Sequence, residues 1–533
     1  MLKITTILIL SFVLRIFGIS WDQGLHLHPD ERMLIMVAER VHFFGKLNPE
    51  FFNYGSLPIY LLRGTAQFID YVFHLQVANY DGMLYLGRGL SLFADLGTVY
   101  FIYLLARKLF KNEKIAFLSS FFYSISFFAI QNSHFFIVDT FLIFSVTALV
   151  YLLLLYLQKP TWKRILFLSL VSAAAITTKI TAVIFLPLVA AVIIYKNYRN
   201  LLKLAKTSLF FTLLFIVFTF VFMPYAYLDW QKFLADVLLQ IKLNSDPYIF
   251  PYTLQYVGTL PYLYYLKNIF LWGLGPVISI MSVIGIFFII KSQSKNRNVI
   301  IFLVFYLFYF LLIGRSAVKF MRYMLPLYPF LTILAGYGLS KLSSNKIVRY
   351  SVILICFVWT ALFLNIYSRE HTRVSATKWI QQNVPAGSNL AVEHWDDSLP
   401  LYGGEKYNFV ELTLYNQPDD EQKWFVLNEK LKQADYIILS SNRLYVPLQK
   451  LADCKKYKLC YPKTAQYYAN LFNGRPVIAR SGSDEAIYFK KVAEFTVYPG
   501  FKIGGWKIEI PDDSADESFT VYDHPKVLIF KKQ

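Results

Sequence analysis

Two adjacent carboxylates, Asp30 and Glu31, follow the first apolar segment of the chain in the run His28-Pro29-Asp30-Glu31-Arg32. A carboxylate can accept a proton from a hydroxyl group and so act as a general base. Asp30 also precedes an amphipathic run that starts at Met33, and an aspartate in this position can instead cap a helix. Neighbouring residues on a helix point about 100° apart. Asp30 and Glu31 therefore cannot address one atom, and we expect them to have different roles.

A third carboxylate, Asp139, opens the apolar segment 136–157 after a short polar run. It is either an acid that favours the positive end of a helix or a further member of a polar site. Asp95 lies deeper, inside the apolar segment 84–106. An unpaired charge there is costly, so we expect Asp95 to pair with another apolar segment.

Five basic residues lie at the ends of apolar segments that face away from the basic loops; they are Arg88, Lys179, Arg315, Lys319 and Arg322. Single cations in such positions commonly extend to lipid headgroups. Five of them beside three acids instead predict a site for an anionic group such as a phosphate. His26, His28 and Asp30 are spaced as metal ligands could be, but the segment is short and no further ligand is evident, so we predict no metal site.

The elements that must position these residues are membrane spans. The chain of 533 residues is 56% hydrophobic and 16% charged, which is typical of a membrane protein. We expect the first span to be kept, because no small-residue cleavage site follows it. The sequence predicts eleven spans, near residues 4–21, 84–106, 115–131, 136–157, 164–178, 180–195, 207–228, 268–290, 298–314, 321–340 and 347–367.

The stretch 165–195 contains one charge, Lys179, and is too long for a single span. Basic residues flank both of its ends, which places both ends on the same side of the membrane. We therefore predict a hairpin of two short spans that turns near Lys179.

Basic residues concentrate in alternate loops between the predicted spans. The first 367 residues contain 31 Lys and Arg against 13 Asp and Glu, whereas the remaining residues are almost neutral. Cytoplasmic loops carry such an excess, so we expect a multi-pass protein of the plasma membrane with a cytoplasmic N-terminus and an extracytoplasmic C-terminal domain. This orientation explains the net charge of +19 without a nucleic acid partner.

The chain divides into two predicted domains. Residues 1–367 form a membrane domain with a large outer loop, 22–83, and residues 368–533 form an α/β-type domain that is large enough for its own core. Cys454 and Cys460 in the second domain either pair outside the cell or stay free. No phosphate-binding loop or nucleophile elbow is present in the sequence, which argues against a nucleotide-driven pump.

Taken together, these features resemble the polytopic GT-C glycosyltransferases of glycosyltransferase family 39, which include the polyprenyl-phosphate-mannose protein mannosyltransferases and the aminoarabinose–lipid A transferases. The similarity covers essentially the whole membrane part and is carried by the order of its pieces. These are His28-Pro29-Asp30-Glu31, Tyr54-Gly55-Ser56-Leu57-Pro58, Arg88, Ser133-His134 through Asp139-Thr140, Thr178-Lys179, Pro261-Tyr262-Leu263-Tyr264-Tyr265, Trp272-Gly273-Leu274-Gly275, Lys319 with Arg322-Tyr323-Met324-Leu325-Pro326, and the tail Phe519–Pro525.

The resemblance implies a sugar donor on polyprenyl phosphate and inverting transfer to an acceptor hydroxyl of a lipid, glycan or protein at the outer membrane face. It implies that Asp30 is the base and that Glu31 and Asp139 bind acceptor or sugar. The five cations would then hold the donor phosphate, Arg88, Lys179 and Arg322 first among them. A divalent cation serves many transferases of this class, but no ligand set for one is evident, so we commit to no cofactor. The β-trefoil domain of the protein mannosyltransferases is not visible, which argues against a protein acceptor.

A transporter or flippase of a polyprenyl-linked glycan is the alternative, because it would share the many spans and the basic inner loops. Transporters often show two related halves with interrupted helices, and we find no such repeat in the sequence. A membrane scaffold without activity would not need clustered outer carboxylates and cations.

Overall fold

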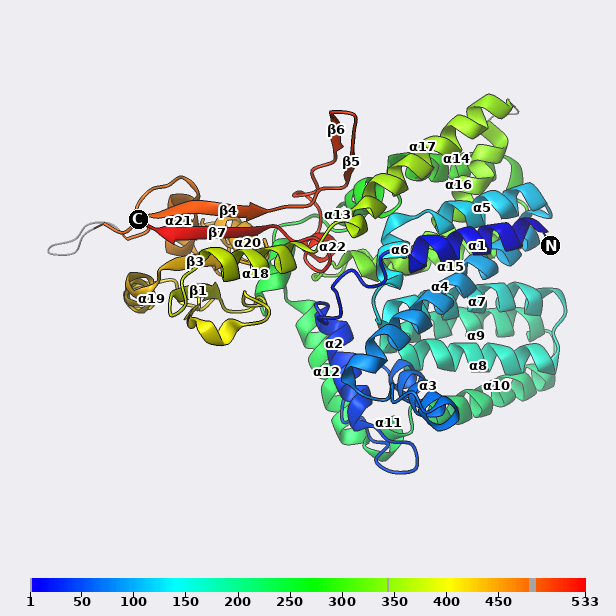
Figure 1. Ribbon diagram of the computed structural model, residues 1–533. Helices are drawn as coiled ribbons and strands as arrows, with labels where there is room; N and C mark the ends of the chain where they lie inside the picture. The colour runs from blue at the N-terminus through cyan, green and yellow to red at the C-terminus, as the bar shows by residue number, and fades with distance from the viewer. Residues whose placement is uncertain (1, 343–344, 479–485) are drawn as a thin grey trace. The chain divides into compact units, whose positions relative to one another are not determined.

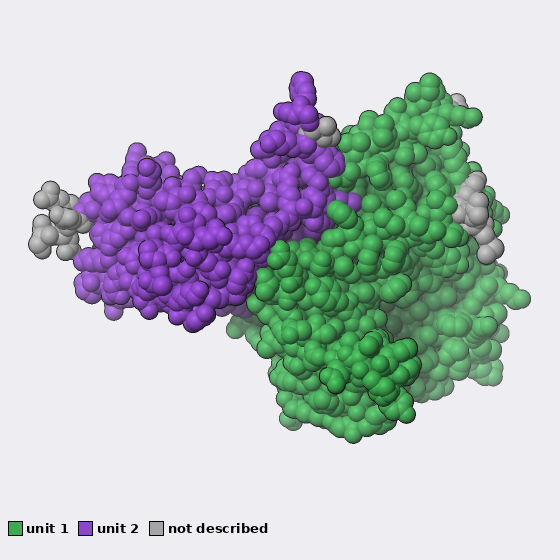
Figure 2. All heavy atoms as spheres, viewed as in Figure 1, with its two compact units in different colours: residues 1–244, 260–361 green, residues 245–259, 362–533 purple. Residues whose placement is uncertain are grey.

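The computed structural model describes residues 2–342, 345–478 and 486–533. The chain folds into two compact units (Figure 2). Residues 1–244 and 260–361 form the membrane unit, and residues 245–259 and 362–533 form the second unit. The second unit thus includes a segment, 245–259, that the sequence analysis places inside the membrane domain.

The membrane unit is built of helices, many of them long and apolar and lying side by side (Figure 1). Helix α5 (Glu113–Ser124) and helix α6 (Phe127–Ser133) are separated by two non-helical residues and form a bend of 60°. The apolar helices are α1 (Leu2–Ile16), α4 (Tyr80–Phe110), α5 (Glu113–Ser124), α6 (Phe127–Ser133), α7 (Val138–Gln158), α8 (Trp162–Thr178), α9 (Leu186–Asn197), α10 (Leu201–Phe222), α14 (Pro276–Gln293), α15 (Arg297–Ile313), α16 (Tyr328–Leu342) and α17 (Lys346–Leu364).

A helix lies at each of the eleven segments predicted to span the membrane. Within the described residues, six helical runs are long and apolar enough to cross a membrane, or seven if the bent pair α5 and α6 counts as one span. The six are Tyr80–Phe110, Val138–Gln158, Ile180–Asn197, Leu201–Phe222, Pro276–Gln293 and Lys346–Asn383. The chain is therefore a multi-pass membrane protein.

The predicted division of the stretch 165–195 at Lys179 is confirmed. Helix α8 ends at Thr178, and Lys179 itself is extended, with φ −145°. A short 3₁₀ helix, η1 (Ile180–Phe185), then leads directly into α9.

Shorter helices complete the membrane unit. Helices α2 (Pro29–Arg40) and α3 (Leu57–Phe73) lie in the first loop, and Leu34, Val37 and Val41 of that loop are buried in one core with Leu62 and Met83. The apolar face of α2 therefore packs against protein. The other short elements are α11 (Tyr225–Leu228), α12 (Trp230–Ser245), α13 (Leu263–Asn268), the π-helix η3 (Ile269–Gly273) and the 3₁₀ helix η4 (Met321–Leu327).

The second unit contains a mixed α/β fold, which confirms the predicted class. Its five-stranded sheet has the order β2-β1-β3-β7-β4, with β1 parallel to β2 and β3, and β7 antiparallel to β3 and β4. Ala391 and Ile437 point into one core and Leu390 and Ile438 into another, so both faces of the sheet are covered. The strands are β1 (Asn389–Glu393), β2 (Asn408–Leu412), β3 (Tyr436–Leu439), β4 (Phe489–Phe495) and β7 (Val527–Lys532), with the hairpin β5 (Gly500–Ile503) and β6 (Trp506–Glu509) apart from them. The helices are η5 (Asn365–Ser368), α18 (Thr372–Asn383), η6 (Gly404–Lys406), α19 (Glu421–Gln433), α20 (Tyr445–Lys450), α21 (Pro462–Phe472) and α22 (Glu517–Thr520), together with the 3₁₀ helix η2 (Pro251–Tyr256) from the inserted segment.

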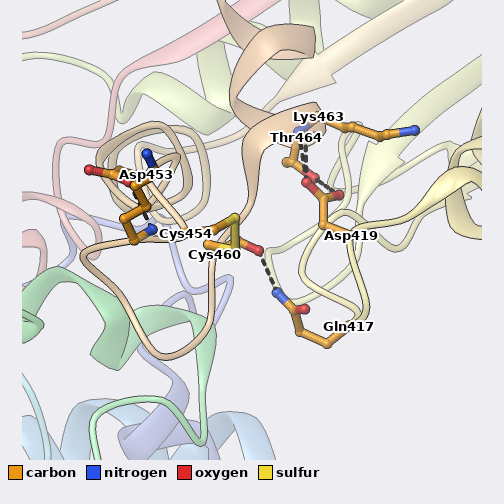
Figure 3. The surroundings of a disulfide bond; sticks show 8 residues. Gln417, Asp419, Asp453, Cys454, Cys460, Lys463 and Thr464 are labelled. Atoms are coloured by element: carbon orange, nitrogen blue, oxygen red, sulfur yellow. Dashed lines mark hydrogen bonds between the residues drawn. A yellow bond between two sulfur atoms is a disulfide. The ribbon is translucent and has the colours of Figure 1, made fainter.

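Cys454 and Cys460 form a disulfide (Figure 3). Of the two alternatives that the sequence leaves open, the structure has the paired one. The Gln417 side chain donates a hydrogen bond to the Cys460 carbonyl at 2.9 Å. Next to it, the Asp419 carboxylate accepts the N–H groups of Lys463 and Thr464 at 2.8 and 3.0 Å, and so satisfies the first turn of α21.

Candidate active site

Asp30 lies in the first turn of α2 but does not cap it. The cap is His28, whose Nδ1 accepts the Glu31 N–H at 3.4 Å, and Pro29 occupies the first helical position, which suits its fixed φ. The Asp30 carboxylate instead forms an ion pair with Arg322 of η4, far away in sequence. The capping alternative for Asp30 is therefore wrong, and its charge faces a cation.

The charge state of Asp30 suits a base. Burial alone raises the pKa of the Asp30 carboxyl, but the Arg322 guanidinium, with smaller contributions from His28 and Lys179, outweighs burial and lowers this pKa below its ordinary value. The carboxylate therefore stays deprotonated at neutral pH and can accept a proton.

Asp139 forms the second ion pair of the site. Its Oδ1 lies 2.7 Å from Nζ of Lys179, and the two side chains are 2% and 12% exposed. The extended backbone at Lys179, between α8 and η1, directs the lysine to the first turn of α7, where Asp139 lies. The same Nζ lies 4.9 Å from the centre of the Tyr323 ring, and Tyr323 follows Arg322 directly.

The loop that carries Tyr54 is pressed against the end of α8. The Gly55 N–H donates to the Thr178 carbonyl at 3.1 Å, and a Cβ on Gly55 would lie 1.9 Å from the Thr177 carbonyl oxygen. Only glycine allows this approach. The contact brings Tyr54 close to Asp30, Asp139 and Arg322, whose charges all act on it. Burial first, and then the two carboxylates, raise the pKa of Tyr54 well above its ordinary value, so its hydroxyl keeps its proton.

Glu31 points into a separate, fully buried cluster with Arg88. Arg88 donates from Nε and Nη2 to Glu31 at 3.0 and 2.7 Å, from Nη1 and Nη2 to Asp22 at 2.9 and 2.8 Å, and from Nη1 to the Ile19 carbonyl at 2.8 Å. These bonds use all five N–H groups of the guanidinium. Glu31 also accepts the Phe136 N–H at 2.8 Å. All donors of Arg88 are therefore taken up by protein groups in this structure.

The two carboxylates of this cluster differ in their pKa. Burial raises the pKa of Glu31 above its ordinary value despite the opposing effect of Arg88. Burial also acts on Asp22, but the hydrogen bonds and charge of Arg88 outweigh it and lower the pKa of Asp22. No sequence motif marks Asp22 as a site residue, because only the fold brings it to Arg88.

The remaining predicted cations lie on the loop before η4. Arg315 is exposed, whereas Lys319 is buried and its Nζ donates to the Ala317 carbonyl at 2.9 Å. Arg322 pairs with Asp30, and Lys179 pairs with Asp139. The structure thus brings together four of the eight predicted site residues.

Asp95 pairs inside the apolar helices, as the sequence predicts. Its Oδ2 lies 2.5 Å from Nε of Arg15 in α1, and its Oδ1 accepts the Tyr123 hydroxyl of α5 at 2.6 Å. The three residues connect α1, α4 and α5, and they are separate from the Asp30 and Asp139 pairs.

A divalent cation does not fit the residues present. Among the described residues, no group of three or more His, Cys, Asp or Glu side chains is placed to hold a metal ion. His28 caps α2, and Nε2 of His26 lies 3.2 Å from Asp81. No step below is routed through a metal.

Comparisons with known proteins concern the fold and the family. The family model described as dolichyl-phosphate-mannose-protein mannosyltransferase matches residues 87–226, which contain Asp139 and Lys179. A protein of Aquifex aeolicus (strain VF5), described as uncharacterized, is 28% identical over 272 residues, which cover 49% of this chain and 50% of that protein. The chain thus matches only half the length of this relative.

Two solved structures share the fold. ArnT from Cupriavidus metallidurans, bound to undecaprenyl phosphate, matches with a TM-score of 0.50 and 13% identity over 84% of this chain and 94% of its own. The apo oligosaccharyltransferase of Archaeoglobus fulgidus matches with a TM-score of 0.50 and 12% identity over 84% and 70%. Identities this low show the fold alone. The protein therefore has a GT-C-like fold, and its residues 87–226 are similar to the dolichyl-phosphate-mannose-protein mannosyltransferase family.

Proposed function

We propose that this protein transfers a sugar from a polyprenyl-phosphate donor to an acceptor hydroxyl and inverts the anomeric carbon. The observation that carries the proposal is the pairing of two carboxylates with two cations, Asp30 with Arg322 and Asp139 with Lys179, near the half-buried Tyr54. A base and positive charge for a phosphate thereby lie within one polar site. The ArnT structure of the same fold holds undecaprenyl phosphate, a carrier of this class.

In the proposed reaction, Asp30 accepts the proton of the acceptor hydroxyl while the acceptor oxygen attacks the anomeric carbon. The new bond joins acceptor oxygen and anomeric carbon, and the bond from that carbon to the phosphate oxygen breaks on the opposite side. The phosphate leaves with the electron pair. Arg322 and Lys179, whose side chains are largely shielded from water, stabilise its growing negative charge. Asp139 holds Lys179, and Tyr54 supplies a hydroxyl donor.

Arg88 and Glu31 position the site in this proposal and do not touch the donor. Their cluster fixes the first turn of α2, and with it Asp30, to α4. Arg315 and Lys319 precede Arg322 on the same loop and remain candidates for contacts with the donor. The acceptor, whether lipid, glycan or protein, follows from the assay below.

The proposed orientation uses all eleven helical segments as spans. The basic loops then face the cytoplasm together with the N-terminus, and the second unit lies outside. The disulfide between Cys454 and Cys460 supports this orientation, since such bonds persist in oxidising compartments.

Purified protein in lipid vesicles, incubated with a panel of labelled polyprenyl-phosphate sugars and candidate acceptors, tests the activity. We expect one sugar to appear on an acceptor with release of polyprenyl phosphate. A transporter would move the labelled lipid between leaflets and leave the bond between sugar and phosphate intact. That result, with no transfer to any acceptor, would contradict the proposal.

Lys179 gives a test of the phosphate contact. We expect Lys179→Ala to weaken donor binding by about ten- to a hundredfold, the range of a hydrogen bond to a charged group, and Lys179→Arg to weaken it less because the positive charge is kept. Binding is measured with a labelled donor in detergent. The double variant Lys179→Ala with Asp139→Asn removes the carboxylate that the single variant leaves unpaired. Recovery of donor binding in the double variant would show that Lys179 serves only to neutralise Asp139.

Cysteine labelling in intact cells tests the proposed orientation of the protein in the membrane. In intact cells treated with an impermeant reductant, we expect an impermeant maleimide to label Cys454 and Cys460, because the second unit faces outside. Cys356 is buried in α17 and serves as the internal control that stays unlabelled until the protein unfolds. Labelling of the pair only after lysis would refute the proposed orientation.

A further inference from the structure

Helix α12 (Trp230–Ser245) exposes a stripe of apolar side chains. It begins soon after the apolar helix α10, with only the short helix α11 between them (Figure 1). Every residue of α12 is described, and none of them is buried. A helix of sixteen residues therefore lies on the surface of its unit.

The polar residues of α12 face the protein. Lys232, Asp236, Gln240 and Asn244 follow one another at four-residue spacing, which places them on one side of the helix. Oδ2 of Asp236 lies 2.9 Å from Nζ of Lys232 and accepts the Phe52 N–H at 3.2 Å. The Asn244 side chain accepts the Tyr323 hydroxyl at 2.7 Å. This polar stripe therefore reaches the candidate active site, because the Tyr323 ring contacts Lys179.

Phe233, Val237 and Leu243 of α12 are half-buried, and other apolar residues of the helix face outward. Trp230, Leu234, Leu238 and Ile241 form the opposite stripe, and their side chains are 57, 41, 55 and 62% exposed. Of the three charged residues in this fully described helix, Lys242 lies on the exposed side, Lys232 has a side chain that is 41% exposed, and Asp236 is the most shielded. A helix on a water-soluble protein turns its apolar stripe inward and its polar face to water. The arrangement in α12 is the reverse.

We propose that the apolar stripe of α12, defined as Trp230, Leu234, Leu238 and Ile241, lies among the acyl chains of the membrane interface. Two further observations select lipid as the occupant. Helix α10, which precedes α12 in the chain and is long and apolar enough to cross the membrane, likewise exposes apolar side chains, among them Leu213, Val217 and Val221. The stripe also begins at Trp230 with Tyr227 nearby, and both residue types are enriched where a membrane meets water.

If α12 lies in the membrane interface, its position also sets how deep the candidate active site lies in the membrane. This consequence rests on the proposed function. Helix α12 would form a wall with lipid on one side and, through Asn244, Tyr323 on the other. The apolar stripe then holds Lys179 and Arg322 at the level of the lipid headgroups. A phosphate that stays attached to its lipid tail could meet these cations without leaving the membrane.

Fluorescence quenching tests the position of α12 without any donor. In a Cys356→Ala background with the disulfide intact, single cysteines replace Leu234, Leu238, Gln240 and Gln422 and are labelled with an environment-sensitive dye. Gln240 lies on the polar stripe of the same helix, and Gln422 is exposed on α19 of the second unit. The labelled protein is placed in vesicles whose acyl chains carry bromine, a contact quencher.

We expect the dyes at Leu234→Cys and Leu238→Cys to lose several times more fluorescence than those at Gln240→Cys and Gln422→Cys. Equal losses at all four positions would overturn the proposal. Cross-links between copies through Leu238→Cys, together with weak quenching there, would also overturn the proposal. They would show that a second copy of the protein, rather than lipid, covers the stripe. Because no sugar donor is present, this result is independent of whether the protein transfers sugar.

Discussion

Replacement of Asp30 by asparagine is expected to lower the rate of sugar transfer by about 10²–10⁴-fold, the usual contribution of a positioned general base. Asparagine keeps the shape of the side chain but cannot take a proton from a hydroxyl group. The helix start is unaffected, because His28 rather than Asp30 caps α2. We therefore expect thermal stability close to that of the parent. Donor binding should persist, since the change removes a competitor of the donor phosphate for Arg322.

The matched control is Asp81→Asn, which removes an exposed carboxylate from the start of α4 and should leave transfer unchanged. Transfer rate, donor binding and thermal unfolding are measured on all variants in the same vesicles. An Asp30→Asn variant that transfers at the parental rate would remove Asp30 as the base and make Asp139 the next candidate. A variant that binds donor, stays folded and no longer transfers would support catalysis over transport.

Replacement of Arg88 by methionine is expected to destabilise the membrane unit by about 3–5 kcal/mol, the usual cost of breaking a buried ion pair from one side. The change leaves Asp22 and Glu31 buried without their cation, and it removes five hydrogen bonds. Thermal and denaturant unfolding in detergent measure the loss. Transfer should fall with the amount of folded protein, because Arg88 supports α2 and does not contact the donor.

A triple variant separates this role from phosphate binding. Combining Arg88→Met with Asp22→Asn and Glu31→Gln removes the unpaired carboxylates, so much of the lost stability should return. If Arg88→Met instead unfolds like the parent but fails to bind donor, then Arg88 contacts the phosphate and the buried cluster opens when donor binds. The comparison is informative because all three residues are fully buried.

Local patterns predicted much of the membrane unit. Apolar length located the helices, and the flanking basic residues indicated the break at Lys179, because both signals act within a few residues of the chain. The cost of a charge among apolar helices predicted that Asp95 would find a partner. The mixed α/β class of the second unit followed from short strands rich in β-branched and aromatic residues.

Which charged residues of the site pair with one another was harder to predict from the sequence. Asp30 and Glu31 are neighbours, yet one faces Arg322 and the other Arg88, and that difference depends on which helices pack against α2. Tyr54 reaches the site because Gly55 fits against α8, a contact between segments far apart in the chain. Residues 245–259 join the second unit through packing around Leu254, which their composition alone does not indicate.

Asp30 and Glu31 point in directions about 100° apart. An insertion in the first turn of α2 would therefore change which partner each side chain meets. Glu31 accepts two of the five Arg88 hydrogen bonds, while Asp22 accepts two and the Ile19 carbonyl one, and these bonds fix the direction in which the preceding residue, Asp30, points. An alanine inserted between Asp30 and Glu31 would rotate one relative to the other by about 100°, so the two side chains could not both keep their partners. An alanine inserted between Gly24 and Leu25, outside the helix, would leave the angle between the Asp30 and Glu31 side chains unchanged. Lineages of this protein should therefore hold constant the spacing from Pro29 to Glu31.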